Sequence, residues 1–353
     1  MAQGHNQHGE IDGARLIVLD ALRGIAALMV LMMHFQALSG HAGLFARSYL
    51  AVDFFFMLSG FVLVPTMESP MLSARSTAHV LARRFARLWP LIVLGAVLGV
   101  FSHAIFWGWP LALGALVIAA LGIPRLVPGT EAMTYPLNQP QWSLVVELAI
   151  NVLHLAILRR LGQRSLLMIA AMCWIALAIA AGDFGALDLG SSGNDWALGF
   201  LRAGFAYPLG IVLARKRARI PKITLPWWSA IAALALLVLA PPLLGLNSRW
   251  SDPVVIALFV PVLVVGATAQ LAGGLPANLR WLGAISFPLY AVHFPILELA
   301  HALADGLPVL MRAPFLLAAL FGSLGFAHVL TRSPLAHGLR WHGDRKRALN
   351  AAT

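Results

Sequence analysis

Long apolar runs with almost no charged residues dominate this chain. Of its 353 residues, 60% are hydrophobic and 11% are charged, a composition that water-soluble globular proteins do not have. Inside a bilayer every backbone polar group must be bonded within the protein, so runs of about 20 apolar residues predict membrane-spanning helices. The sequence therefore predicts an all-α, polytopic transmembrane helical bundle.

Ten of these runs are candidate membrane spans. They cover residues 17–38, 48–66, 88–107, 142–158, 165–182, 196–214, 226–246, 253–271, 281–299 and 313–330. An eleventh run, residues 111–123, is too short to cross comfortably and lies between Pro110 and Pro124. We expect it to form a re-entrant or interfacial helix.

The distribution of basic residues fixes the expected sidedness. With ten crossings and both termini cytoplasmic, 19 of the 25 Lys and Arg residues lie in cytoplasmic segments and four in external ones. This asymmetry follows the positive-inside rule, whereas an additional crossing at residues 111–123 would move two basic clusters outside. Topology also accounts for the net charge of +11, so no nucleic-acid partner is expected.

The chain reads as one membrane domain with two polar ends. We expect residues 1–15 to be a disordered tail, residues 16–331 to be the transmembrane domain and residues 332–353 to be a basic tail. Residues 1–15 contain no apolar run, so we expect the first span to be retained in the mature protein. The single cysteine, Cys173, excludes an intrachain disulfide and a cysteine metal site, and we expect no bound metal.

An arginine and a histidine share the first span. Arg23 and His34 are eleven residues apart, so on a helix their side chains lie on one face, about 16 Å apart along the axis. Ionisable residues inside a membrane are costly and usually face a protein interior or a watery cavity. The span therefore predicts a charge toward one leaflet and a proton carrier toward the other. The alternative for Arg23 is a simple ion pair with Asp20.

Other polar residues recur at helical spacing within the spans. Ser143, Glu147, Asn151 and His154 follow one face of the fourth span, and Ser286, Tyr290 and His293 follow one face of the ninth. Asp53 and Arg202 lie in the outer parts of the second and sixth spans. Such stripes indicate an internal cavity. Taken alone, however, His154 or His293 is more often a residue that hydrogen-bonds two helices.

Six short segments carry these residues in a specific order. They are Leu19-Asp-Ala-Leu-Arg-Gly with His34, Val52-Asp-Phe-Phe-Phe-Met-Leu-Ser-Gly-Phe61, Arg84-Phe-Ala-Arg87-Leu-Trp-Pro90, Trp142-Ser-Leu-Val-Val-Glu147, Arg202-Ala-Gly-Phe-Ala-Tyr-Pro-Leu-Gly210 and Ile285-Ser-Phe-Pro-Leu-Tyr-Ala-Val-His293-Phe-Pro. Together they make the chain, from about residue 16 to residue 330, resemble the acyltransferase-3 family of bacterial integral-membrane acyltransferases.

The resemblance implies an enzyme of the bacterial inner membrane in its stand-alone membrane form. Such an enzyme transfers an acyl group, commonly acetyl, from cytoplasmic acyl-coenzyme A to a hydroxyl of a glycan, lipid-linked sugar or small glycoside. Carried over to this chain, the resemblance implies that His34 is catalytic. It also implies that Arg84 and Arg87 contact the donor and that Arg23 is the motif partner of His34 on the donor side.

The residue chemistry is consistent with this reading. An imidazole can take the proton of a hydroxyl at neutral pH, so His34 suits a general base, and Glu147 could orient it or stabilise its charged form. We predict that the acceptor is bound by residues of the outer half: Asp53, Trp142, Ser143, Arg202, Tyr290 and His293. The alternative for Arg202 is an ion pair that only joins helices. Whether His34 deprotonates the acceptor or briefly carries the acyl group stays open.

A proton-coupled secondary transporter or flippase is the competing function. Intramembrane Arg, Glu, Asp and His residues also mark proton relays and substrate paths. The sequence, however, has no repeated halves and no paired broken helices at matching positions. A structural membrane scaffold is the weakest reading, because it has no use for so many polar residues within spans.

Overall fold

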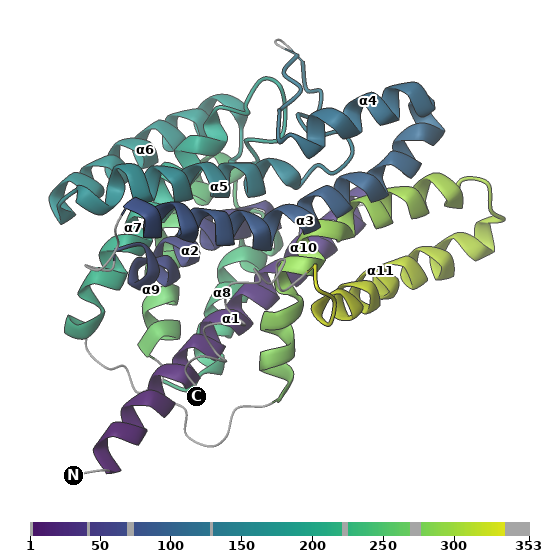
Figure 1. Cartoon of the computed structure of the whole chain (residues 1–353). Coiled ribbons are helices and arrows are strands. Elements are labelled where there is room, and N and C mark those ends of the chain that lie inside the picture. Colours follow the sequence, from purple (N-terminus) through teal and green to yellow (C-terminus); the bar gives the residue numbers. More distant parts are fainter. Residues whose placement is uncertain are drawn as a thin grey trace.

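The computed structural model describes residues 3–40, 43–68, 74–127, 130–220, 225–268 and 277–335. Helices make up nearly all of the regular structure in these ranges. The β-structure described there is one isolated bridge between Met133 and Ser192. In Figure 1, α1 runs through the middle of the bundle, α4, α5 and α6 lie along one side, and α11 lies along another. The predicted all-α membrane fold is confirmed.

The α-helices and short 3-10 helices (η) of the described residues follow one another along the chain. They are α1 (Gln3–Leu38), η1 (Ser48–Leu50), α2 (Ala51–Met67), α3 (Ala74–Trp107), α4 (Trp109–Ala120), α5 (Gln141–Ala156), η2 (Leu158–Arg160), α6 (Gln163–Phe184), α7 (Leu198–Lys216), η3 (Arg217–Arg219), α8 (Trp228–Leu243), α9 (Ser248–Thr268), α10 (Ala277–Ala304) and α11 (Val309–Thr331). Within the described ranges, eight helices are long and apolar enough to cross a membrane: α1, α2, α3, α6, α7, α9, α10 and α11.

Every predicted span corresponds to a helix of the structure, and eight of the ten correspond to these long helices. The spans at residues 142–158 and 226–246 correspond to α5 and α8, which have only 16 residues each. The short run at residues 111–123 corresponds to α4, with 12 residues. The helices α1 and α3 begin well before the predicted spans, so Arg84 lies on a continuous helix. The number of crossings and their direction stay predictions.

The ends of the chain are only partly described. The helix α1 begins at Gln3, and it therefore includes most of residues 1–15, which we expected as a disordered tail. Residues 336–353 of the expected basic tail lie outside the described residues. The division of the chain into two tails and one membrane domain stays a prediction.

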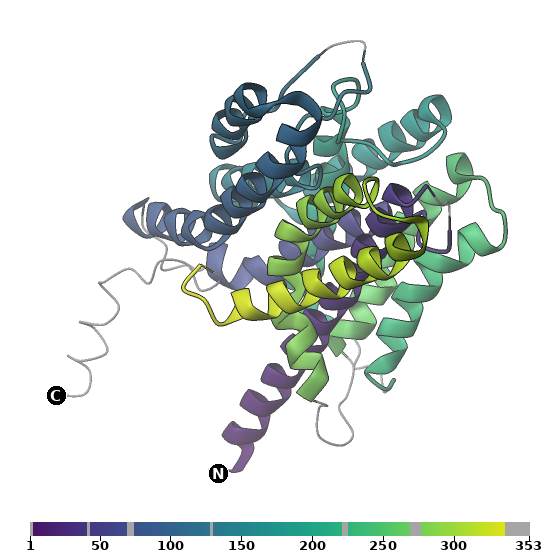
Figure 2. The same cartoon turned by 90° about the vertical axis from the view of Figure 1, so that its right-hand side faces the viewer.

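Two close helix pairs form the centre of the bundle. The most extensive packing joins α1 to α10 and α2 to α7, and the view in Figure 2 shows α1 and α10 side by side. A Cβ atom on Gly60 would lie 2.2 Å from the carbonyl oxygen of Tyr207, and one on Gly210 would lie 2.1 Å from that of Met57. Glycine therefore permits the close approach of α2 and α7, which brings Asp53 and Arg202 together.

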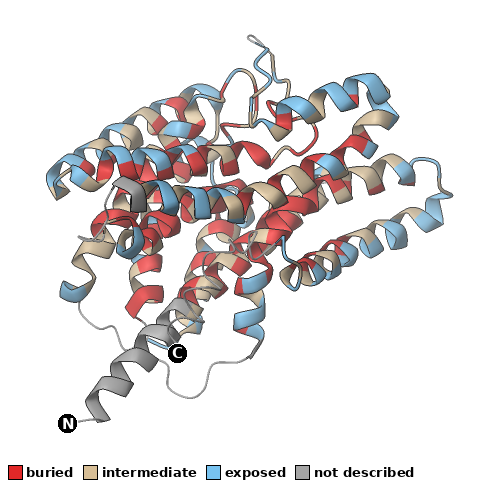
Figure 3. Cartoon of the chain, in the orientation of Figure 1, coloured by how far each residue is buried: buried red, intermediate tan, exposed pale blue. Residues whose placement is uncertain are grey.

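The outer helices expose apolar side chains. On α4, Leu111 and Val117 are each 61% exposed, and on α11, Leu310 is 92% exposed. Figure 3 shows these exposed faces around a buried centre. A water-soluble protein rarely exposes such large apolar surfaces. In a membrane protein they face the lipid chains, so the polar residues of the central helices are left to build the site.

Candidate active site

Three cavities follow one another through the bundle. The first, called here the histidine cavity, has a volume of about 400 Å³ and contains His34 in its wall. The second, the middle cavity, has a volume of about 380 Å³. The third, the arginine cavity, has a volume of about 710 Å³. Its wall carries Arg23, Arg83, Arg84, Arg87 and Arg280.

Shared side chains separate each cavity from the next. Val52 and Tyr290 line both the histidine cavity and the middle cavity. Arg23, Arg84 and Arg87 line both the middle cavity and the arginine cavity. The three cavities therefore lie in a row between a cluster of arginines and His34.

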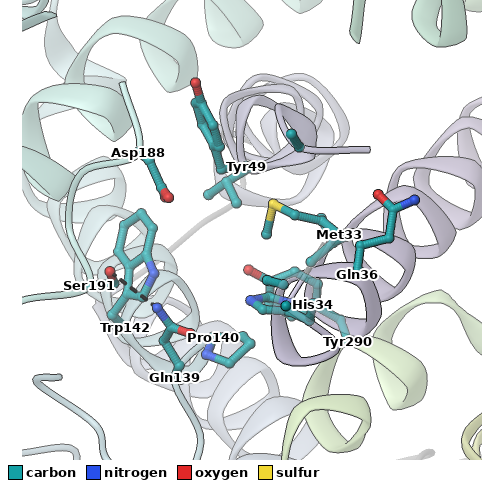
Figure 4. Close-up of a pocket in the computed structure, with 15 residues that line it drawn as sticks. Met33, His34, Gln36, Tyr49, Gln139, Pro140, Trp142, Asp188, Ser191 and Tyr290 are labelled. Atoms are coloured by element: carbon teal, nitrogen blue, oxygen red, sulfur yellow. Dashed lines mark hydrogen bonds between the residues drawn. The ribbon is translucent and has the colours of Figure 1, made fainter. Parts of the chain in front are cut away.

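His34 is paired with a second histidine from the far end of the sequence. Nδ1 of His34 lies 3.0 Å from Nε2 of His293. Phe294 packs edge-on against the His34 ring, with 5.1 Å between the ring centroids. His293 is fully buried in α10, whereas His34 is partly exposed. Figure 4 shows His34 beside Tyr290 in the wall of the histidine cavity.

The hydrogen bonds of His293 fix the tautomers of this pair. Nδ1 of His293 lies 2.9 Å from the carbonyl oxygen of Leu289, and a carbonyl can only accept, so this nitrogen carries the proton. Nε2 of neutral His293 is then an acceptor, and Nδ1 of His34 donates to it. Neutral His34 is left with an unprotonated Nε2, as a general base requires.

A proline helps to place the segment of α10 that carries His293. Pro295 lies within this helix, and because proline lacks an N–H group, the carbonyl of Ala291 loses its usual helical donor. The side-chain amide of Asn138 donates to that carbonyl instead, at 2.8 Å. This bond ties α10 to the segment that leads into α5.

Tyr290 and Ser143 form part of the partition between the histidine and middle cavities. The Ser143 hydroxyl donates to the carbonyl of Pro140 at 2.9 Å, so the Tyr290 hydroxyl, 2.7 Å away, donates to Ser143. Phe55 packs edge-on against Tyr290, with 5.3 Å between centroids. Both predicted residues therefore lie where the two cavities meet.

Glu147 faces the middle cavity and not His34. Arg84 forms an ion pair with Glu147, and Ser59 donates a hydrogen bond of 2.7 Å to the same carboxylate oxygen. Among the described residues, no hydrogen bond or ion pair joins Glu147 to His34. The sequence suggested Glu147 as the group that orients His34. In the structure the hydrogen-bond partner of His34 is His293, and that of Glu147 is Arg84.

The remaining predicted donor contacts lie in the arginine cavity. Arg23 donates to the hydroxyl of Ser286 at 2.9 Å and pairs with Asp20 at 2.9 Å, which was the alternative that the sequence left open. Arg87 is exposed to the cavities. It makes no hydrogen bond or ion pair with another residue in the described ranges. Asp20 is the carboxylate in this wall, so the cavity is strongly positive.

Asp53 and Arg202 form a buried ion pair that lines none of the three cavities. Both side chains are fully buried, and Arg202 donates to Asp53 from two nitrogens, at 2.7 and 3.2 Å. It also donates to the carbonyls of Leu189 and Tyr49 at 2.8 and 2.7 Å. Its guanidinium lies 5.3 Å from the ring centroid of Trp142. This geometry favours the helix-joining alternative, with Trp142 between the ion pair and the histidine cavity.

The polar stripe on α5 continues beyond Glu147. Tyr207 donates to Asn151 at 3.0 Å, and His154 bonds to Glu68 at 2.9 Å. Arg215 donates to both oxygens of Glu68 at 2.8 Å. Burial alone would raise the pKa of Glu68, but the hydrogen bonds from His154 and Arg215 lower it below its ordinary value. None of these residues lines the three cavities, so this part of the stripe joins α2, α5 and α7.

Four polar residues of the histidine cavity were not predicted from the sequence. They are Gln36, Gln139, Asp188 and Ser191. Gln36 lies two residues after His34 and Gln139 three residues before Trp142, and this closeness in sequence is a signal that could have found them. Asp188 and Ser191 lie in the connection between α6 and α7, and no periodicity predicts the path of such a segment.

Comparisons with known proteins agree with this architecture. Residues 16–332 match an acyltransferase family described as an acyltransferase domain. The chain is 33% identical over 186 residues to a protein of Rhizobium radiobacter named protein 2 in picA locus, a match that covers 48% of this chain and 96% of that protein. No solved structure matches the chain. With its membrane helices and the match over most of its length, this chain belongs to the acyltransferase-3 family of multi-pass membrane acyltransferases.

Proposed function

We propose that this membrane acyltransferase moves an acyl group, commonly acetyl, from acyl-coenzyme A to a hydroxyl of a glycan, lipid-linked sugar or glycoside. The donor enters from the cytoplasmic side of a bacterial inner membrane, and the acceptor reacts at the opposite side. One observation carries the proposal: three neighbouring cavities lie in a row, with five arginines in the wall of the cavity at one end and His34 in the wall of the cavity at the other.

The arginine cavity suits the phosphates of coenzyme A. Guanidinium groups bind phosphate through paired, charge-assisted hydrogen bonds, and Arg87 has no competing partner among the described residues. The middle cavity is less polar, because most of its wall surface is apolar. Phe55, Phe56 and Phe287 are part of this wall. A thin pantetheine arm fits such a passage, and its thioester would then reach the partition at Tyr290.

The chemistry at the far end depends on His34. Its Nε2 takes the proton of the acceptor hydroxyl while the hydroxyl oxygen attacks the thioester carbonyl. The C–S bond then breaks, the acyl group stays on the acceptor oxygen, and the proton on His34 passes to the departing thiolate. The hydrogen bond to His293 holds the ring throughout and stabilises its charged form.

Arg87→Ala tests the donor side of the proposal. We expect it to raise the KM for acetyl-coenzyme A about tenfold or more and to change the KM for the acceptor much less, because a hydrogen bond to a charged group contributes roughly 1.5–3 kcal/mol. Arg84→Ala should act in the same direction, but it also leaves Glu147 without its ion pair.

Steady-state kinetics on purified protein measure both constants. The matched control is Arg160→Ala, since Arg160 is an exposed arginine of η2 that lines none of the three cavities. A larger change in the acceptor KM than in the donor KM would make Arg84 and Arg87 topology anchors instead of donor contacts.

His293→Ala tests the orientation of the base. We expect kcat to fall about a hundredfold or more with little change in the donor KM, because His34 loses the acceptor that fixes its tautomer. His293→Gln should recover part of the rate, since an amide oxygen can accept from Nδ1 of His34. Equal rates for the two variants, at equal yields of folded protein, would show that His293 only fills space.

A further inference from the structure

The wall of the histidine cavity carries one carboxylate and no arginine or lysine within the described residues. The carboxylate belongs to Asp188. In Figure 4, Asp188, Ser191 and Trp142 lie across the cavity from His34. Other polar lining groups are the amides of Gln36 and Gln139. The chemistry of this wall is therefore the opposite of that in the arginine cavity.

Asp188 differs from the other carboxylates around it. Asp252 accepts a hydrogen bond of 2.6 Å from Tyr49, and Asp195 accepts two from backbone N–H groups, at 2.9 and 3.0 Å. Asp188 has no hydrogen bond or ion pair with another residue in the described ranges, and its side chain is exposed to the cavity. Arg202 is the basic group that acts on Asp188, but its donors are already bound to other groups.

The surroundings of Asp188 make a second negative charge unfavourable. Burial raises the pKa of Asp188, the charge of Arg202 lowers it, and the charges of Asp195 and Asp252 raise it. An anion brought into this cavity would meet the Asp188 carboxylate with no arginine or lysine among the described residues of the wall, and like charges at a binding surface cost affinity strongly. Hydroxyl groups, in contrast, would donate to the carboxylate that now lacks a donor.

The remaining wall fits a polyhydroxylated ring. The Trp142 ring offers an apolar surface, while Gln36, Gln139 and Ser191 offer donors and acceptors. The Gln139 amide already donates to Ser191 at 3.5 Å, a long bond that a ligand could replace. A volume of about 400 Å³ lies within the usual range for small-molecule sites, roughly 300–1,000 Å³.

We propose that the histidine cavity binds an uncharged sugar ring, and that Asp188 accepts hydrogen bonds from its hydroxyls and rejects acceptors that carry a negative charge on the ring. This inference rests on the proposed function, because it takes the cavity beside His34 as the acceptor site. It adds the charge class of the acceptor and names a residue that selects it.

Methyl glucuronide and methyl glucuronamide are suitable probes, because they have the same ring and differ in charge at one carbon. With acetyl-coenzyme A as donor, we expect the purified full-length protein to use the amide with a kcat/KM at least about tenfold above that for the acid. Asp188→Asn should bring this ratio close to one. Asp183→Asn, which changes an exposed carboxylate at the end of α6, should leave it unchanged. A ratio that Asp188→Asn does not alter would overturn the proposal.

A second measurement needs neither turnover nor a variant. Isothermal titration calorimetry of each sugar with the purified full-length protein, without donor, reports its affinity directly. We expect the glucuronamide to bind at least about tenfold more tightly than the glucuronate. Equal binding of both sugars, or of neither, would contradict the selection by Asp188. Selective binding without any acyl transfer would instead show that the proposed function is wrong and the binding site is right.

Discussion

Replacing His34 with alanine is expected to reduce acyl transfer about a thousandfold or more without loss of folded protein. General acid–base catalysis by one side chain contributes about 10²–10⁴-fold, and the alanine variant also loses the bond to His293. The side chain lies in a cavity wall and is only partly buried, so its removal should cost little stability. Product formation is measured by mass spectrometry of the acylated acceptor.

His103→Ala is the matched control for this change. His103 is a partly buried histidine of α3, and it lines none of the three cavities. We expect it to keep close to full activity. Near-normal product from His34→Ala, in protein that elutes as a single folded species, would eliminate His34 as the base.

Breaking the ion pair between Asp53 and Arg202 is expected to produce the largest loss of stability. Asp53→Ala leaves a guanidinium without its carboxylate at a fully buried position, and breaking a buried pair typically costs about 3–5 kcal/mol. Arg202→Lys keeps the charge but loses the planar guanidinium, which also donates hydrogen bonds to two backbone carbonyls. It should therefore also lower the yield of folded protein. Thermal unfolding in detergent, followed by fluorescence, measures the effect.

The double change Asp53→Leu with Arg202→Met separates structure from acceptor binding. Replacing both charges by apolar groups of similar size often restores stability, so we expect the double variant to recover much of the loss. Glu131→Ala, at an exposed carboxylate that Asn194 contacts, should have little effect on stability. Normal stability in both single variants, with weaker use of the acceptor, would return Arg202 to the acceptor site.

The helices were largely predictable from the sequence, because their signal is local. A run of about 20 apolar residues is sufficient evidence for a membrane helix, and each predicted run corresponds to a helix. The starts of α1 and α3 were not predictable in this way. At Gln3 and Ala74 the helices begin in polar sequence, where hydropathy carries no information.

Several of the side chains that line the cavities were predictable from the sequence, but their pairing was not. The spacing of Arg23 and His34 predicted a charge and a proton carrier at different depths of one helix, and the two residues line different cavities. Helical periodicity, however, gives the face of a helix and not its neighbour. It could not show that α10 brings His293 against His34, or that Arg84 on α3 forms an ion pair with Glu147.

The sequence also could not show how deeply each side chain is buried in the bundle. The place of Arg202 in the outer part of a span favours contact with an acceptor, but the structure buries it fully against Asp53 of α2. Asp188 was not predicted because the sequence could not show that it faces the histidine cavity. It lies in an irregular connection, whose path depends on contacts such as the bond from the Leu187 backbone to Asp252.

Transfer in sealed, inverted membrane vesicles tests the central claim most directly. In these vesicles the cytoplasmic side faces the medium, which contains labelled acetyl-coenzyme A, and a membrane-impermeant glycoside that serves as acceptor is enclosed in the lumen. If the donor enters at the arginine cavity and the acceptor reacts at His34 on the other side, labelled product will form inside the vesicles, and His34→Ala will abolish it. Product that forms only when donor and acceptor share the same side would contradict the account.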